Sequence, residues 1–410
     1  MSRYKTYPQY KDSGVEWLGE VPTHWEKGLL SNLFTNNKEK NSGMLNNNLL
    51  SLSYGKIVNK DIETAFGLLP ESFESYQIVH DGFIILRLTD LQNDQKSLRT
   101  GFVTQTGIIT SAYVGLKKKS KSIGNEKYFY LYLHAFDIFK GFYGMGSGVR
   151  QSLNYDELKK LQFILPPLEE QNLIVNFLDN ATCKIDTLIQ KQQNLIELLK
   201  EKRQAAVENI IMQDKIVSMR LGMVVDQIFR PVDRKMEEIY IALGLYNRGR
   251  GLFHKEPKEG SELGDSDFYW IQDGDLILSG QFAWEGAVAL AGESENNCIV
   301  SHRYPVLRGK ENIINTEYLW AFLTTKIGDF ILNENSVGSA GRNRPLNINT
   351  LMKEKIPVPN FEAQLKISRI VQIEKKISES IAKTIELLKE RRTALISATV
   401  TGKIDVREIK

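Results

Sequence analysis

The sequence has few of the residues that build disulfide bonds or metal sites. Its 410 residues include two cysteines, Cys183 and Cys298, too few for a disulfide framework and without the paired spacing of a structural zinc site. The five histidines are scattered, and none has a second histidine three or four residues away. We therefore expect two reduced cysteines and no bound metal.

Long apolar runs and nucleotide-binding motifs are also missing. Runs such as FIIL are far too short to span a bilayer, and the opening MSRYKTYPQYK lacks the apolar core of a signal peptide. No Gly-x-x-x-x-Gly-Lys-Ser/Thr loop occurs. The only Pro-Pro pair, in ILPPLEEQ, lacks the flanking residues of an adenine-methylating catalytic loop. These absences predict a cytoplasmic, non-catalytic chain that binds no cofactor itself and contacts no membrane.

Composition and charge leave the kind of partner open. Apolar residues make up 42% and charged residues 25% of the chain, as in ordinary globular proteins, and the length suggests two or three domains. The net charge is only +3. Any binding to nucleic acid must therefore depend on local basic patches rather than on the field of the whole chain.

The most informative feature is an internal repeat that covers the chain. IELLKEKR at 196–203 returns as IELLKERR at 385–392. Upstream, LPPLEEQ is matched by VPNFEAQ, GSGVRQSLN by GSAGRNRPLN, and IVHDGFIIL by WIQDGDLIL, always in the same order and with offsets between 189 and 193. A chance likeness of two helices would not give this ordered series, so the sequence predicts a tandem duplication.

Each copy reads as a globular part followed by a long helix. Short β-branched runs bounded by Gly, Asp and Asn indicate strands, whereas YFYLYLHAFDIF and YLWAFLTTKIGDFIL each suit one helix of about three turns. We expect α/β (α+β) domains at 1–165 and 216–357, a central helix at 166–215, and a distal helix with a C-terminal tail at 358–410. Heptad-like spacing predicts that the two helices pair as an antiparallel coiled coil with pseudo-twofold symmetry. The expected seam includes Leu188, Leu195, Leu199, Ile381, Leu388 and Leu395.

Several loops combine small residues with arginine, lysine, glutamine or asparagine. Small residues let backbone amides approach phosphates, while Arg and Lys suit guanine and Asn and Gln suit adenine. Each loop could instead be an ordinary surface turn, and the lysine run a solvated hairpin tip. The candidate DNA contacts are Arg87, Arg99, Lys117, Lys118, Lys119, Arg150, Gln151, Arg248, Arg250, Gln281, Arg303, Arg342, Asn343 and Arg344.

Three stretches resemble the signature regions of one known family. They are YPQYKDSGVEWLGEVPTHWE near the N-terminus, LPPLEEQ with the helix through IELLKEKRQAAV, and IELLKERRTALISATVTGKIDVRE near the C-terminus. Together they resemble the specificity (S) subunit of type I restriction-modification systems. The resemblance implies that 1–165 and 216–357 are target-recognition domains, each reading half of a bipartite site in double-stranded DNA, while the paired helices set the spacer.

The resemblance also implies partners that carry the chemistry. Two modification (methyltransferase) subunits would dock on the helices and bind S-adenosylmethionine, and restriction subunits would add ATP-driven translocation and cleavage. VPNFEAQ departs from LPPLEEQ by losing Pro-Pro and one acidic residue, so the two docking faces need not be equivalent. The alternatives are a coiled-coil adaptor that presents two protein-binding domains without DNA, and a self-contained methyltransferase.

Overall fold

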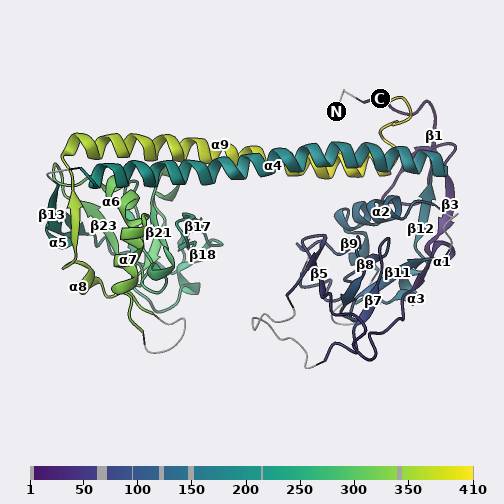
Figure 1. Cartoon of the computed structure of the whole chain (residues 1–410), viewed down its shortest axis with the longest axis horizontal. Coiled ribbons are helices and arrows are strands. Elements are labelled where there is room, and N and C mark those ends of the chain that lie inside the picture. Colours follow the sequence, from purple (N-terminus) through teal and green to yellow (C-terminus); the bar gives the residue numbers. More distant parts are fainter. Residues whose placement is uncertain are drawn as a thin grey trace. The chain divides into compact units, whose positions relative to one another are not determined.

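The computed structural model describes residues 4–61, 72–94, 96–119, 124–145, 152–213, 216–338 and 344–409. The chain divides into two compact units, Met1–Ile189 with Ile385–Lys410 (unit 1) and Gln190–Thr384 (unit 2). Each unit therefore holds one globular part and one end of each of two long helices, α4 (Leu168–Ile211) and α9 (Phe361–Val400) (Figure 1). None of the described helices is both long enough and apolar enough to cross a membrane.

A four-stranded antiparallel sheet forms the centre of each globular part, and the strand order is the same in both. In unit 1 the order is β4 (Phe34–Asn36), β11 (Val114–Lys118), β8 (Ile84–Leu86), β9 (Thr100–Phe102). In unit 2 it is β14 (Val225–Gln227), β23 (Val306–Gly309), β20 (Leu276–Leu278), β21 (Val288–Leu290). The duplication in the sequence is thus a duplication of sheet topology.

Three further antiparallel strand pairs are also repeated. In unit 1 these are β3 (Glu26–Leu29) with β12 (Gln162–Leu165), β5 (Leu50–Ser53) with β6 (Lys56–Asn59), and β7 (Gln77–Val79) with β10 (Gly107–Ile109). Their counterparts are β13 (Val217–Arg220) with β24 (Lys355–Val358), β16 (Leu243–Leu245) with β17 (Leu252–His254), and β19 (Phe268–Trp270) with β22 (Ile299–Ser301). Within the described ranges, two pairs are not repeated, β1 (Tyr10–Asp12) with β2 (Glu20–Pro22) and β15 (Ile239–Tyr240) with β18 (Lys258–Glu259).

The helix that packs on the sheet differs between the copies. Unit 1 has one helix, α2 (Glu126–Ile138), as expected. The single helix expected in unit 2 is wrong, because the segment forms α6 (Thr316–Leu323) and α7 (Lys326–Glu334). Thr325 caps α7 by accepting the Gly328 N–H at 3.3 Å, and a Cβ on Gly328 would lie 2.3 Å from the Phe322 carbonyl oxygen. The break therefore needs both a capping side chain and a glycine.

The remaining helical segments in the part of the chain that the structure describes are single turns. They are α1 (Leu30–Leu33), α3 (Tyr155–Leu158), α5 (Leu221–Val224), α8 (Ile348–Leu351) and the 3-10 turns η1 (Gly141–Gly144), η2 (Gly260–Glu262), η3 (Ala283–Glu285) and η4 (Glu293–Glu295).

One glutamine joins each long helix to its globular part in the same way. Gln171 of α4 accepts a hydrogen bond from the backbone N–H of Asn125, the N-cap of α2, at 3.0 Å. Gln364 of α9 accepts from the backbone N–H of Asn315, the N-cap of α6, at 2.7 Å. Both amides donate to the carbonyl five residues earlier, and both side chains are buried. The glutamine shared by LPPLEEQ and VPNFEAQ thus fixes where the helix leaves the domain.

The two helices run antiparallel within each unit. In unit 1, Leu178 near the start of α4 and Leu395 near the end of α9 belong to one apolar core with the globular part. In unit 2, Val207 near the end of α4 shares a core with Ile367 and Val371 near the start of α9. The apolar stripe is therefore buried mainly where it meets a globular part.

The predicted seam is only partly correct. Ile381 and Leu395 are buried, and Leu199 and Leu388 are half-buried. Leu188 and Leu195, in contrast, are 47% and 40% exposed. The heptad spacing identifies the apolar side of each helix. It does not identify which residues on that side are buried, because burial requires a globular part or a partner helix beside each residue.

The N-terminal segment is held in unit 1 by a buried carboxylate. Glu170 of α4 accepts hydrogen bonds from the Tyr7 hydroxyl at 2.6 Å and the Trp25 indole at 2.9 Å, and His24 Nε2 lies 2.7 Å away. The C-terminal tail packs on the same segment, since Tyr10 donates to the Gly402 carbonyl at 3.0 Å. The repeat has alanine, Ala363, at the position of Glu170, so it lacks the carboxylate that holds this segment in unit 1.

Candidate nucleic-acid interface

Three predicted contacts of unit 2 meet at the end of the sheet where β20 ends and β23 begins, which we call the loop end. The Gly280 N–H donates to the Arg303 carbonyl at 2.7 Å, and the Gly280 carbonyl accepts the Leu346 N–H at 2.9 Å. Gln281 and Arg303 are exposed. Arg344 lies over the Trp284 ring at 5.0 Å and donates to the Ser336 carbonyl and the Asn333 side chain. This end of the sheet therefore carries two guanidinium groups, an amide and an indole.

The NRGRG loop, which joins β16 to β17, lies on the η3 turn beside that group. Arg248 donates its backbone N–H to the Glu285 carbonyl at 2.7 Å, and Gly249 donates to the Gly286 carbonyl at 2.8 Å. The Arg250 guanidinium stacks on Tyr246 at 5.1 Å. Both arginine side chains are exposed, so the loop adds two cations to the same side of the domain.

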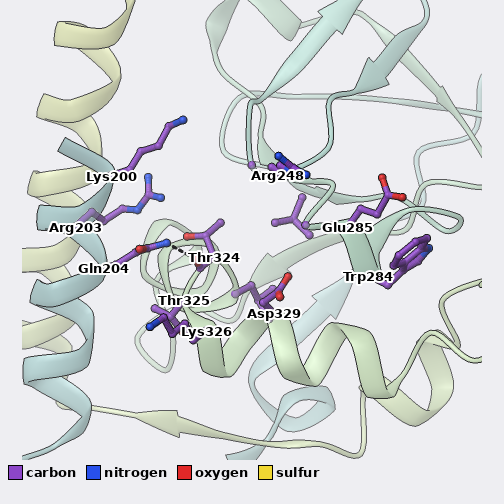
Figure 2. Close-up of a pocket in the computed structure, with 14 residues that line it drawn as sticks. Lys200, Arg203, Gln204, Arg248, Trp284, Glu285, Thr324, Thr325, Lys326 and Asp329 are labelled. Atoms are coloured by element: carbon purple, nitrogen blue, oxygen red, sulfur yellow. Dashed lines mark hydrogen bonds between the residues drawn. The ribbon is translucent and has the colours of Figure 1, made fainter. Parts of the chain in front are cut away.

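A polar cleft of about 400 Å³ separates this loop from α4. Figure 2 shows Arg248, Glu285 and Trp284 across the cleft from Lys200 and Gln204 of α4. Its floor is the start of α7, where burial raises the pKa of Asp329. Cations and carboxylates therefore share the cleft, which makes it less suited to phosphate than the open loop end.

Unit 1 has a corresponding loop end, where β8 ends and β11 begins. The Leu153 N–H donates to the Leu88 carbonyl at 2.9 Å, which repeats the bond between Leu346 and Gly280. A cleft of about 430 Å³ opens here, with the exposed Lys38 and Lys40 on its lining. Other polar side chains of the lining are Asn36, Asn37, Gln77 and Ser111. Lysine beside asparagine is a composition that suits phosphate and base edges.

Arg87 and Arg99 lie at this end of the sheet, but only one of them is accessible. Arg87 is partly exposed and forms an ion pair with Asp94 at 2.5 Å. The prediction for Arg99 is wrong, because its side chain is 1% exposed and its guanidinium donates to backbone carbonyls, including that of Thr89 at 3.0 Å. Hydrogen bonds from Ser97, helped by both arginines, hold the pKa of Asp94 well below its usual range. Arg99 therefore shapes the loop that carries Arg87.

The lysine run lies at the opposite end of the sheet. Lys117 and Lys119 are exposed, but they lie at the end of β11, whereas Arg87 lies beyond its beginning. Lys118 is nearly buried and forms an ion pair with Glu126 at 2.6 Å. The expectation that the three lysines act as one exposed cluster is therefore wrong for Lys118, and none of them joins the loop end.

Four predicted contacts, Arg150, Gln151, Arg342 and Asn343, lie outside the described residues. Lys38, Lys40 and Trp284 also lie at these ends of the sheets, although sequence reasoning did not select them. Among the described residues no group of three or more His, Cys, Asp or Glu could hold a metal ion.

The two copies of the domain thus carry basic and amide side chains at the same end of their sheets. The family model of the type I restriction modification DNA specificity domain matches residues 91–198 and 241–390, more than half of the chain. The chain therefore belongs to this family, whose members are non-catalytic DNA-recognition components. No curated protein matches the sequence.

Solved structures of type I systems match the chain along nearly its whole length. A chain from a study of complex assembly and conformational transition of the type I R-M system is 14% identical, with a TM-score of 0.57 over 93% of this chain and 98% of that one. The S subunit from M. genitalium is 14% identical, with a TM-score of 0.45 over 92% and 96% of the two chains. The HsdS subunit from Thermoanaerobacter tengcongensis is 15% identical, with a TM-score of 0.42 over 94% and 98%. The first of these likenesses supports the fold.

Proposed function

We propose that each recognition domain binds one half of a bipartite site in double-stranded DNA through the loop end of its sheet. The observation that carries this proposal is the hydrogen bond repeated as Leu153 to Leu88 and Leu346 to Gly280. It holds the chain after each Gly-rich loop against the strand end where the exposed cations lie. Equivalent surfaces on two copies are what a protein that reads two half-sites needs.

We further propose that the paired helices set the spacer and dock two modification subunits. The repeated motif leaves the same leucine uncovered in both copies, since Leu198 is 58% and Leu387 is 56% exposed. Exposed leucines on a rigid helix favour a protein partner, and equivalent ones favour two similar partners. S-adenosylmethionine and ATP would then be bound by modification and restriction subunits, not by this chain.

The first test is a methylome of cells that express the chain with its modification partner. A bipartite motif is expected, and duplexes containing it should bind the purified complex with a strong dependence on salt, because phosphate contacts release counterions. Duplex binding that is absent at low salt would favour the coiled-coil adaptor. Binding of S-adenosylmethionine by the chain alone would favour a self-contained methyltransferase.

The second test replaces one exposed arginine at the loop end. Arg303→Ala should cost about 1–3 kcal/mol of binding free energy and relax the specificity of one half-site only. Arg220→Ala is the matched control, because Arg220 is also exposed in unit 2 but lies on β13. Equal affinities of the two variants at two salt concentrations would remove Arg303 from the interface.

A further inference from the structure

Each recognition domain has a hairpin whose tip residue is forced into a left-handed backbone conformation. In unit 1, β5 and β6 are joined by Tyr54 and Gly55, with φ of 48° and 75°. In unit 2, the loop between β16 and β17 contains Arg248 and Gly249, both with φ of 60°. Positive φ is an outlier for bulky residues other than glycine, and such outliers cluster at functional sites.

The tip in unit 1 is fixed by contacts to its backbone. The Gly55 carbonyl accepts a hydrogen bond from the Tyr130 hydroxyl of α2 at 3.3 Å. A Cβ on Gly55 would lie 2.8 Å from a Leu98 methyl group and 3.6 Å from His134 Cε1. The Tyr54 side chain takes no part in this anchoring, because it is 91% exposed. The hairpin therefore presents a free aromatic ring on a rigid base.

The hairpin tip in unit 2 is held by contacts at positions equivalent to those in unit 1. Gly286, which Gly249 contacts through its backbone, precedes β21 by two residues, as Leu98 precedes β9. A Cβ on Gly249 would lie 3.7 Å from Thr324, the C-cap of α6, which is nine residues after the N-cap Asn315 as His134 is nine residues after the N-cap Asn125. Tyr54 and Arg248 are therefore structural equivalents, although their loops differ in length and sequence.

Both tips lie at the loop end of their sheets. β9 pairs with β8 so that Thr100 is opposite Leu86, next to Arg87. β21 pairs with β20 so that Val288 is opposite Leu278, two residues before Gly280. The hairpin tips thus stand beside the surfaces that carry Arg87 and Arg303.

We propose that the two hairpin tips are matched DNA-contact points that use different chemistry. Tyr54 packs its ring against a base in one half-site, and Arg248 supplies a guanidinium to the other. This inference rests on the proposed function and adds a contact residue, Tyr54, that has no basic or amide group. The occupant is DNA rather than protein, because the equivalent tip is cationic and both stand at the end of the sheet that carries the exposed cations. A rigidly held ring contacts a base with little loss of conformational freedom.

The test uses the full chain in complex with its modification partner and a duplex carrying the methylated motif. 2-Aminopurine placed at successive positions of each half-site reports stacking on individual bases. Tyr54→Ala should weaken binding roughly 5- to 150-fold and abolish the fluorescence change at one position of one half-site. Tyr54→Phe should keep the wild-type affinity and the fluorescence change. Arg248→Ala should weaken contacts with the other half-site and lower the salt dependence by about one counterion.

Tyr54→Asn separates binding from folding. Asparagine tolerates a positive φ better than tyrosine, so this variant should be at least as stable as the wild type and still lose the affinity. Wild-type affinity and fluorescence in Tyr54→Asn would overturn the proposal for the tip. Absence of any bipartite motif in the wild type would instead overturn the proposed function, so the two failures are distinguishable.

Discussion

Two buried titratable side chains of α2 respond to pH in opposite directions. Burial, assisted by Arg392, lowers the pKa of His134 to about 4 from 6.5. Burial raises the pKa of Asp137 to about 6 from 3.8, although the backbone N–H of Arg99 donates to its carboxylate. Neutral forms of both are therefore favoured inside unit 1.

The signs of the two contributions follow from these shifts. His134 contributes stability that is present above pH 6.5 and is lost as the pH falls towards 4. Asp137 contributes stability that is present below pH 3.8 and is lost as the pH rises through 6. Between pH 5 and 7.5 the two effects largely cancel.

Removing one of the two groups should therefore reveal the pH dependence of stability that the other contributes. Compared with wild type, His134→Gln should gain about 1–2 kcal/mol of unfolding free energy when the pH is lowered from 7.5 to 5. Asp137→Asn should lose a similar amount over the same change. Urea unfolding at the two pH values measures both. Parallel pH dependence in wild type and both variants would show that neither group is shifted.

At the scale of elements, the repeated helical motif ends in an arginine that pairs with the other helix in each unit. Arg203 donates to Glu374 at 2.8 Å, and both side chains are buried. Arg392 donates to Asp186 at 3.0 Å, and both side chains are partly exposed. Burial lowers the pKa of Arg203 and raises that of Glu374, so desolvation outweighs their mutual attraction. The two arginines occupy equivalent positions in the repeat, but their ion pairs contribute unequally to stability.

Arg203→Ala should therefore destabilise the chain by about 3–5 kcal/mol, because it leaves Glu374 buried and unpaired. Arg392→Ala is the matched control and should cost at most about 1 kcal/mol. Denaturant unfolding of the two variants tests the difference.

The double variant Arg203→Met with Glu374→Met removes both charges at once. It should recover most of the loss, since buried ion pairs are often replaceable by apolar side chains. A double variant as unstable as Arg203→Ala would show that packing, not the unpaired charge, is the cause.

The elements that were predictable from sequence are those whose residues recur in both copies. The long helices, the α2 helix and the loop ends followed from similar segments in the same order. Arg248 was also predicted, but its equivalence to Tyr54 was not, because SYGK and YNRGRG share no pattern and the equivalence depends on contacts made by Leu98 and Gly286. The burial of Arg99 was equally hidden, because it depends on how the following loop brings its carbonyls together.

At the scale of the whole molecule, the helices differ in length by one turn. α4 has 44 residues and α9 has 40, which accounts for the fall in the repeat offset from 193 to 189 along the helix. The insertion lies between the glutamine that joins the helix to the domain and the IELLKE motif. The two helical segments are therefore similar at both ends and unequal in between.

If the helices measure the spacer, lengthening both should change it. Seven residues inserted after Ile189 and seven after Thr384 add roughly 10 Å, or about three base pairs of duplex. The methylome should then show the same half-sites separated by a longer spacer. An unchanged spacer would refute the ruler, and altered half-sites would show that the insertion disturbed the recognition domains.

The glutamine junction has a consequence for how new specificities arise. Because Gln171 and Gln364 offer the same acceptor to an asparagine-capped helix, a recognition domain moved from one place to the other would meet the same partner there. The exception is the segment that Glu170 holds, which would have to stay with the first helix. If each domain reads one half-site, as proposed, exchange of a single domain by recombination would replace half of the target sequence in one step, without new mutations at the junction.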